Sequence, residues 1–302
     1  MKTNLKSIFL LLTGVTFFLF SCEQDEISIE EDANLVTESS QEVVDKFIPQ
    51  EPVTDQKILD LIRTLEIDSG DVTKGDFHLP DGTVEQRIYI GHDITITEAE
   101  LQAMQFIEDQ SRQYRTFNLV TGNNRTIDIL GYVNNDQFSL NNNERTALQW
   151  AVDNYNRLSG VSLQFNLTYG SNFQAADMVV YDITANRPGE SGGVAGFPDS
   201  SGRAFKWVQI FGIGNAPLNT IEHVIAHEIG HSVGFRHTDF FNRISCPVGP
   251  LRGNEGSGSD GAVHISGTPT GNDFTSVMNA CVRAGTDGEF NGNDITALRN
   301  IY

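Results

Sequence analysis

The chain has 302 residues, and its 40 acidic and 20 basic side chains give a formal net charge of −20. A chain of this length can form one large domain or two smaller ones. The negative charge argues against a nucleic-acid partner, because neutralising phosphate groups requires lysine and arginine. It also disfavours adsorption to anionic lipid and binding of long acidic substrates.

The amino terminus has the pattern of an export signal. Lys2 and Lys6 precede an apolar run, residues 8–20, which is short for a membrane-spanning helix. Ser21-Cys22 follows at once, and a small residue before a cysteine at this place resembles a bacterial lipoprotein box. The resemblance implies that residues 1–21 are a signal peptide and that Cys22 carries a lipid that anchors the chain to a membrane. The alternative is an ordinary secreted protein whose removed signal peptide contains Cys22.

An acidic stretch follows this cysteine. Between residues 23 and 56 there are eleven acidic residues and one lysine, which together supply half of the net charge. Such a segment can bury little apolar surface, so we expect residues 22–54 to be a flexible tether. Acidic residues directly after the cysteine are similar to the surface-export tags of Bacteroidetes lipoproteins. This similarity implies an exported outer-membrane lipoprotein displayed at the cell surface.

Residues 55–115 are expected to form a small ordered region ahead of a larger domain. Residues 54–68 have the pattern of an amphipathic helix, and residues 84–96 alternate between apolar and polar side chains as a strand does. A second helix is expected from residue 97 to about residue 112. The place of this region in the chain indicates a pro-segment.

Residues 116–302 are predicted to form one α+β domain. Strands are expected at 126–133, 161–169, 178–183 and 206–211, and a long helix capped by Ser139 or Asn142 is expected to end near Leu158. A loop rich in glycine and proline, 186–203, contains a further segment at 192–198. Either this segment or 206–211 is expected to be the sheet edge along which an extended peptide pairs its backbone.

Residues 221–239 contain three histidines at spacings that suit one metal ion. His227 and His231 are four residues apart and share one face of a helix, and Glu228 lies beside the first of them. Gly234 allows the left-handed turn that ends a helix, and this turn can bring His237 back to the other two. Three neutral imidazoles with an open fourth position describe a catalytic zinc site, whereas a structural zinc would more often use thiolates.

The spacing His227-Glu228-x-x-His231-x-x-Gly234-x-x-His237 resembles the elongated zinc signature of the metzincin metallopeptidases. Ser276-Val277-Met278-Asn279 is similar to the methionine turn beneath the zinc in that group. The spelling His-Glu-Ile-Gly-His is most similar to the bacterial dual-action HEIGH metallopeptidases, over residues 115–302. The resemblance implies a metzincin-like α+β fold with a twisted mixed sheet, a long active-site helix, a turn at Met278 and a C-terminal helix.

This resemblance also implies an activity. We expect a monomeric zinc endopeptidase that acts on extracellular proteins or peptides, with Glu228 as the general base toward a zinc-bound water. Asp239 is a candidate partner for a ligand histidine, or else a turn residue. The competing hypothesis is a catalytically silent surface binding protein that keeps zinc on the same fold.

A latency switch is expected ahead of the domain. In astacin-like enzymes a pro-segment aspartate can occupy the open position at the zinc, and residues 91–94 and 75–77 both loosely resemble that switch. Asp93 is the preferred candidate, although aspartate is also common in turns. A cysteine switch is excluded, because no cysteine lies between residues 23 and 245.

The three cysteines are Cys22, Cys246 and Cys281. If Cys22 carries lipid, the other two can pair in an oxidising compartment. Their disulfide would join a segment just past the zinc motif to one just past the methionine turn.

Two loops of the domain have open assignments. The glycine- and serine-rich loop 253–261 is expected to be a mobile cover or plain surface. Asp287, Glu289 and Asn291 are in step with a calcium loop, but its twelfth position is Leu298 rather than glutamate. Calcium is therefore retained only as a candidate second cofactor. The alternative is that Asn293 or Asp294 caps a last helix, residues 295–302.

Overall fold

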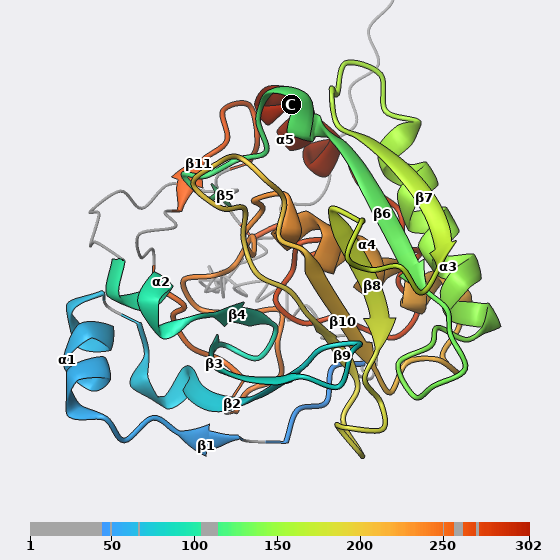
Figure 1. The fold of residues 1–302 in the computed structure, drawn as a ribbon. Helices are drawn as coiled ribbons and strands as arrows, with labels where there is room; N and C mark the ends of the chain where they lie inside the picture. Colours follow the sequence, from blue (N-terminus) through green and yellow to red (C-terminus); the bar gives the residue numbers. More distant parts are fainter. Residues whose placement is uncertain are drawn as a thin grey trace, which may run out of the picture. The chain divides into compact units, whose positions relative to one another are not determined.

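The computed structural model describes residues 44–48, 50–65, 67–103, 114–249, 251–256, 262–269 and 272–302 (Figure 1). All of them belong to the compact unit Gln41–Tyr302. The predicted signal peptide and Cys22 lie outside the described residues. Within the described ranges, no helix combines the length and the apolar character needed to cross a membrane.

A five-stranded sheet is the framework of the larger part of this unit. Its strands lie in the order β7 (Gln164–Gly170), β6 (Thr126–Tyr132), β8 (Met178–Asp182), β10 (Trp207–Phe211) and β9 (Gly192–Val194). The first four are parallel, and β9 pairs antiparallel with β10. Of the two segments left open by the sequence, β9 is therefore the edge strand and β10 is an inner strand.

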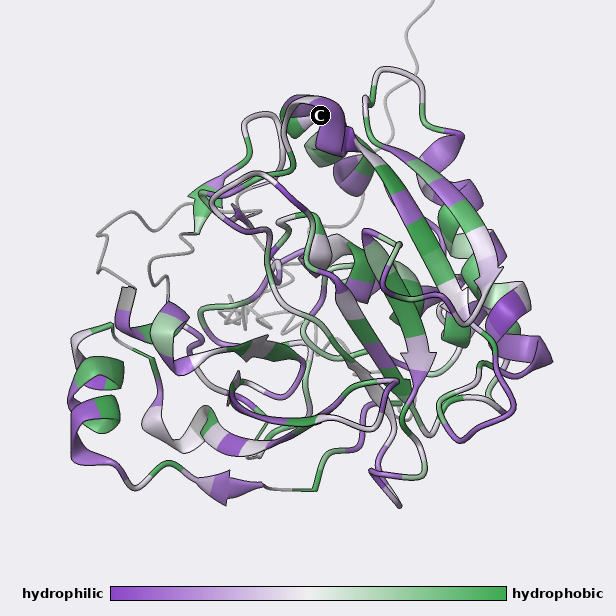
Figure 2. Ribbon diagram, in the orientation of Figure 1, coloured by the Kyte–Doolittle hydropathy of each residue, from purple (hydrophilic) through white to green (hydrophobic). Residues whose placement is uncertain are grey.

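Two helices, α3 (Asn142–Asn156) and α4 (Leu218–Ser232), pack against each other and against this sheet. Asn141, rather than either predicted residue, caps α3, because its side chain accepts the N–H groups of Asn143 and Glu144. Hydrophobic residues form bands along β6 and β8 (Figure 2). With the helices these strands enclose the main core, which includes Ile129, Leu148, Val180, Ile225 and Ile229.

A second sheet is built from the residues before 100. It contains β1 (Glu51–Pro52), β2 (Val72–His78), β3 (Val84–Ile90) and β4 (Ile94–Ile96), all antiparallel and in that order. Helix α1 (Gln56–Thr64) buries Ile58 and Ile62 in a core that it shares with this sheet. The sheet has its own core, distinct from the one beneath α3 and α4.

The segment 84–96, predicted to be extended, forms two strands rather than one, since the chain reverses between β3 and β4. Gly91 takes a positive φ of 68°, a conformation that favours glycine, and Asp93 follows in the turn. The hairpin is joined to the segment after β9, because Thr95 N–H donates to Ala195 O and Ala195 N–H donates to Asp93 O, with N···O distances of 2.8 and 2.9 Å. These bonds fix Asp93 next to the edge strand.

Shorter elements complete the structure. They are the 3-10 turns η1 (Ser69–Asp71) and η2 (Gly122–Arg125), the helices α2 (Glu98–Ala103) and α5 (Gly292–Ile301), and the paired strands β5 (Tyr114–Arg115) and β11 (Val263–His264). The rest of the predicted helix at 97–112 lies outside the described residues. Asn291 is the N-cap of α5, and Asp294 completes its capping box.

Candidate metal centre

Helix α4 carries two of the three candidate ligands, and every residue of its last three turns is buried. His227 and His231 lie one turn apart on it, as their spacing predicts. The helix ends at Ser232. Gly234, two residues later, has a φ of 103°, and a Cβ there would lie 2.9 Å from the side chains of Leu119 and Thr116. The chain then turns back and places His237 beside the two helical histidines.

The three rings present their Nε2 atoms to one point. Nε2 of His237 lies 3.2 Å from Nε2 of His227 and 3.1 Å from Nε2 of His231. The opposite nitrogens have other partners, because Nδ1 of His227 lies 2.8 Å from Val277 O and Nδ1 of His231 lies 2.8 Å from Phe235 O. A backbone carbonyl accepts a hydrogen bond from a protonated Nδ1, so the Nε2 lone pairs of these two rings are free to bind a metal.

The donor set fits a metal ion of the size of zinc. In a tetrahedral site with metal–nitrogen distances near 2.0–2.1 Å, neighbouring nitrogens are separated by ~3.3 Å. The observed separations are close to this value. Asp93 contributes an oxygen to the same group, and the four donor atoms all lie within 4.8 Å of one another. The arrangement can therefore hold one metal ion with three imidazoles and one carboxylate.

Asp93 lies on the metal side of the histidines. Its Oδ2 is 2.9 Å from Nε2 of His237 and 3.5 Å from Nε2 of His227. Burial alone would raise the pKa of Asp93, but the facing histidines, His237 first among them, lower it well below its ordinary value. Its Oδ2 is the fourth donor atom of the group, beside the three imidazole nitrogens.

Glu228 lies on α4 beside the group and is 2% exposed. Burial, and then the charge of Asp93, raises the pKa of Glu228 well above its ordinary value. Its Oε2 has no hydrogen-bond partner within the described part of the chain. A Cβ on Gly193 of β9 would lie 2.5 Å from Oε1 of Glu228, so only glycine leaves room for this side chain against the edge strand.

Met278 packs beneath α4, as the predicted methionine turn requires. A Cβ on Gly230 would lie 2.5 Å from its sulfur, so the helix and the turn are in direct contact. The turn also positions two ligands, since Val277 O faces His227 and Met278 O accepts the N–H of Thr238, next to His237. The sulfur itself is not among the donor atoms of the metal group.

Glu255 is a site residue that the sequence did not reveal. Its Oε1 lies 2.5 Å from Nδ1 of His237, and both side chains are fully buried. Burial alone would lower the pKa of His237, but Asp93 and Glu255 raise it well above its ordinary value. This part of the loop predicted at 253–261 is therefore interior, while residues 257–261 lie outside the described ranges.

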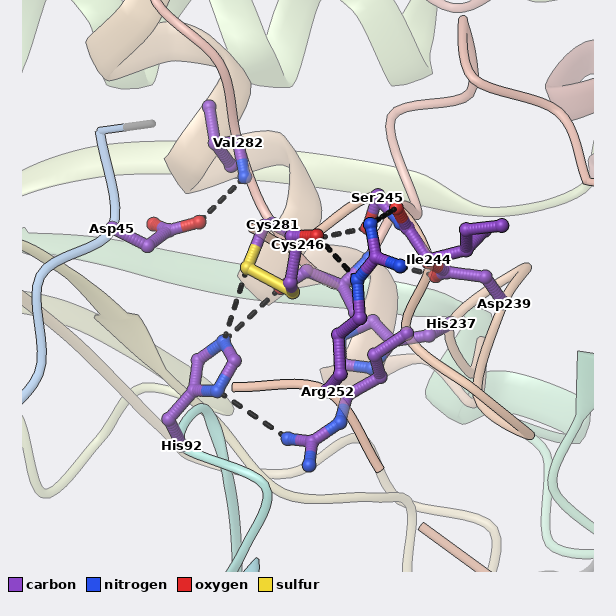
Figure 3. Close-up of a disulfide and its surroundings, with 12 residues drawn as sticks. Asp45, His92, His237, Asp239, Ile244, Ser245, Cys246, Arg252, Cys281 and Val282 are labelled. Carbon is purple, nitrogen blue, oxygen red and sulfur yellow. Dashed lines mark hydrogen bonds between the residues drawn. A yellow bond between two sulfur atoms is a disulfide. The ribbon is translucent and has the colours of Figure 1, made fainter. Parts of the chain in front are cut away.

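Cys246 and Cys281 form a disulfide with a Cα–Cα distance of 5.0 Å (Figure 3). Asp239 binds the segments on both sides of it, because its carboxylate accepts the N–H groups of Ser245 at 2.7 Å and Ala280 at 3.0 Å. Asp239 therefore braces the backbone, and within the described structure it has no hydrogen bond to a ligand histidine. Sγ of Cys281 lies 4.0 Å from Nε2 of His92, and the same nitrogen lies 3.1 Å from Ala280 O.

Residues 44–48, part of the predicted tether, run alongside β9. Lys46 exchanges two backbone hydrogen bonds with Ser191, with N···O distances of 2.8 and 2.9 Å. On the other side Val44 N–H donates to Val282 O at 2.8 Å, and the carboxylate of Asp45 accepts the N–H of Val282 at 2.5 Å (Figure 3). The segment therefore joins the edge strand to the chain that follows the methionine turn.

The space beside the histidines is nearly filled. Asp45, Phe47, Asp93, Gly193 and Glu228 are among the residues that line a cavity of about 10 Å³. Burial raises the pKa of Asp45 to about 8. A cavity of this size holds at most about one water molecule, so no peptide fits beside Glu228 in this arrangement.

The three candidate calcium ligands have other partners. Asp287 accepts the N–H of Glu289, Glu289 pairs with Arg157, and Asn291 caps α5. Calcium binding there stays a prediction.

Comparison with known proteins places these observations in a family. The sequence profile of the dual-action HEIGH metallo-peptidase family matches residues 88–302. Two solved structures of myroilysin are similar to the chain. One is 10% identical, covers 61% of this chain and 82% of its own, and has a TM-score of 0.36. The other is 11% identical, covers 61% and 86%, and has a TM-score of 0.35. No curated protein matches the chain.

Proposed function

This chain belongs to the dual-action HEIGH metallopeptidase family, and from that membership we propose that it is a zinc endopeptidase for extracellular proteins or peptides. The observation that carries the proposal is the meeting of three Nε2 atoms beside a buried glutamate. His227, His231 and His237 supply the nitrogens, and Glu228 supplies a carboxylate with an unpartnered oxygen. A purely structural metal site has no need of that carboxylate.

Peptide hydrolysis at this site would combine a metal ion with groups of the chain itself. A zinc ion held by the three histidines would polarise the scissile carbonyl and acidify a water molecule. Glu228 accepts the proton of the attacking water and returns it to the leaving amide nitrogen. The edge at β9 offers backbone groups to an extended peptide, and Ser191, directly before this strand, already pairs in this way with Lys46.

Cleavage of casein and of a mixed peptide library tests this function. The full-length chain and its Asp93→Ala variant are assayed, and new amino termini are identified by mass spectrometry. We expect cleavage that a chelator abolishes and added zinc restores, and none in a Glu228→Ala background. Equal cleavage with Glu228→Ala would exclude the mechanism. Zinc binding without cleavage in every variant would instead support the silent binding protein.

We also propose that Asp93 keeps the precursor latent. Its ionised carboxylate lies where a water molecule or substrate oxygen would approach the metal, and residues 44–48 cover the adjacent edge strand. Removal of Asp93 and of residues 44–48, by cleavage or by displacement, would open the fourth position at the metal and the edge strand beside it. The test is the rate of peptide cleavage by the Asp93→Ala precursor relative to the unaltered chain.

Export and lipid anchoring through Cys22 are proposed from the sequence pattern of residues 1–32. We expect the chain, produced in a Gram-negative bacterium with its own leader, to fractionate with the outer membrane as a monomer. Cys22→Ala should move it to the soluble fraction. External protease added to whole cells distinguishes surface display, which predicts digestion, from a periplasmic orientation, which predicts protection.

A further inference from the structure

Glu255 and the metal position lie on opposite sides of the His237 ring. Nε2 of His237 faces the other two histidines, while Nδ1 faces Oε1 of Glu255 at 2.5 Å. Each of the other ligand histidines turns its Nδ1 to a neutral backbone carbonyl. His237 is thus the one ligand of the three whose outer nitrogen meets a carboxylate.

The Glu255 carboxylate is held by more than this bond. Nη2 of Arg236 lies 3.5 Å from its Oε2, and Nε of Arg243 lies 3.9 Å from its Oε1. All three side chains are buried. A buried carboxylate is costly unless charged partners compensate it, and here two arginines and a histidine do so. The charge at this point is therefore stable inside the fold.

The backbone at Glu255 is fixed from two directions. Its N–H donates to Phe240 O at 2.9 Å, which ties it to the loop that follows His237. The preceding residue, Asn254, accepts the N–H of Asp68 at 2.9 Å. Gly256 has a φ of 66°, and a Cβ there would lie 2.8 Å from Leu65 O. The residues after α1 thus support the loop that carries Glu255.

We propose that Glu255 is a positioning residue for the metal centre, which holds the His237 ring with Nε2 toward the metal and strengthens that nitrogen as a donor. A carboxylate that accepts the outer N–H of a ligand histidine fixes its tautomer and raises its basicity, and losing it typically weakens metal binding by about 10- to 100-fold. The inference rests on the proposed function in that it takes zinc as the metal. It adds a residue outside the zinc signature.

Metal affinity of the full-length chain is the direct test. Zinc binding is measured by competition with a chromophoric chelator for the unaltered protein, Glu255→Ala and Glu255→Gln. We expect about 10- to 100-fold weaker binding for Glu255→Ala. A smaller loss is expected for Glu255→Gln, whose amide oxygen still accepts the Nδ1 proton without the charge. The visible absorption spectrum of the cobalt-loaded protein reports the geometry around the metal. It should shift more for Glu255→Ala than for Glu255→Gln.

Two further variants keep the result interpretable. Glu144→Gln removes another buried carboxylate, one that accepts the N–H of Asn141 in the capping box of α3, far along the chain from the ligands. It should leave zinc affinity within about twofold. His231→Ala should abolish zinc binding if the proposed function is right, and unchanged binding there would overturn that function instead. If Glu255→Ala does not fold, the zinc affinity and cobalt spectrum of Glu255→Gln test the proposal. Zinc affinity and a cobalt spectrum equal to those of the unaltered protein would overturn the role of Glu255.

Discussion

Oδ2 of Asp93 lies 2.9 Å from Nε2 of His237, the nitrogen that faces the metal position. Two features place it there: Gly91 turns the chain after β3, and Ala195 N–H binds Asp93 O beside the edge strand. The hairpin thus delivers a carboxylate to the histidines from a part of the chain more than a hundred residues earlier. A tight carboxylate at this position competes with any substrate oxygen.

Replacing Asp93 should therefore activate the precursor. We expect Asp93→Ala to raise the initial rate of peptide cleavage by on the order of tenfold or more, because the competent open form is no longer a minor population. Asp76→Ala serves as the control, since Asp76 belongs to the other candidate segment and its carboxylate binds the Gln86 side chain. Equal rates for Asp93→Ala and the unaltered precursor would contradict the latency role.

Residues 44–48 should limit that activation. Lys46→Pro removes the N–H that donates to Ser191 O, so the segment loses one of its two backbone hydrogen bonds to Ser191, the residue directly before β9. In the Asp93→Ala background we expect this change to increase peptide cleavage further, by roughly fivefold if one backbone bond worth about 1 kcal/mol is lost. Lys46→Ala keeps the N–H and is the matched control. The idea fails if the alanine and proline variants have the same rate.

Glu228→Gln should separate chemistry from metal binding. The amide has nearly the same shape but cannot accept the proton of the attacking water, so kcat should fall by about 10²- to 10⁴-fold. Glu228 is not among the donors that converge on the metal, so the zinc content should stay at that of the unaltered protein. Metal analysis and single-turnover rates on one preparation check both. A proportional loss of zinc would mean that the variant had damaged the site rather than the chemistry.

The elements that sequence predicted best depend on local spacing. His227, Glu228 and His231 lie on one helix, so their four-residue period suffices to place them. His237 required one further local signal, the glycine two residues after the helix end. Met278 and the two cysteines were found by their order along the chain, and the structure brings the cysteines into a disulfide.

The missed features depend on long-range contacts. Glu255 lies in a glycine-rich stretch whose composition is typical of surface, and only the fold brings it to His237. Asp45 is one of many acids in a segment of high charge, yet Val282 N–H and burial distinguish it from the others. Neither residue stands in a periodic pattern. Its role follows from partners that one-dimensional spacing does not reveal.

Loss of the disulfide should cost stability more than chemistry. The bond closes a loop with a sequence separation of 35 residues, which corresponds to about 3–4 kcal/mol in the loop-entropy estimate. We expect Cys246→Ser with Cys281→Ser to lower the free energy of unfolding by that amount, measured by denaturant titration. Free-thiol titration before and after reduction supplies the control. Unchanged stability of the double variant would show that the bond does not constrain the unfolded chain as estimated.

Acid should destabilise the fold through buried histidines outside the ligand set. Burial lowers the pKa of His223 from 6.5 to about 3, and its Nε2 has no partner within the described residues. Below pH 6.5 the unfolded chain takes up a proton that the folded chain refuses until about pH 3. The unfolded state therefore binds more protons, and this group lowers the free energy of unfolding by about 1.4 kcal/mol for each pH unit of fall between these values.

His223→Gln should remove that part of the acid dependence. The glutamine does not titrate, so the variant is spared this loss of stability. Its free energy of unfolding should therefore increase relative to that of the unaltered protein as the pH falls from about 7 to about 4. Denaturant titrations of both proteins, each with a chelator present to remove metal, measure the difference at every pH. A pH-independent difference for His223→Gln would contradict the assignment of His223 as a buried, neutral histidine.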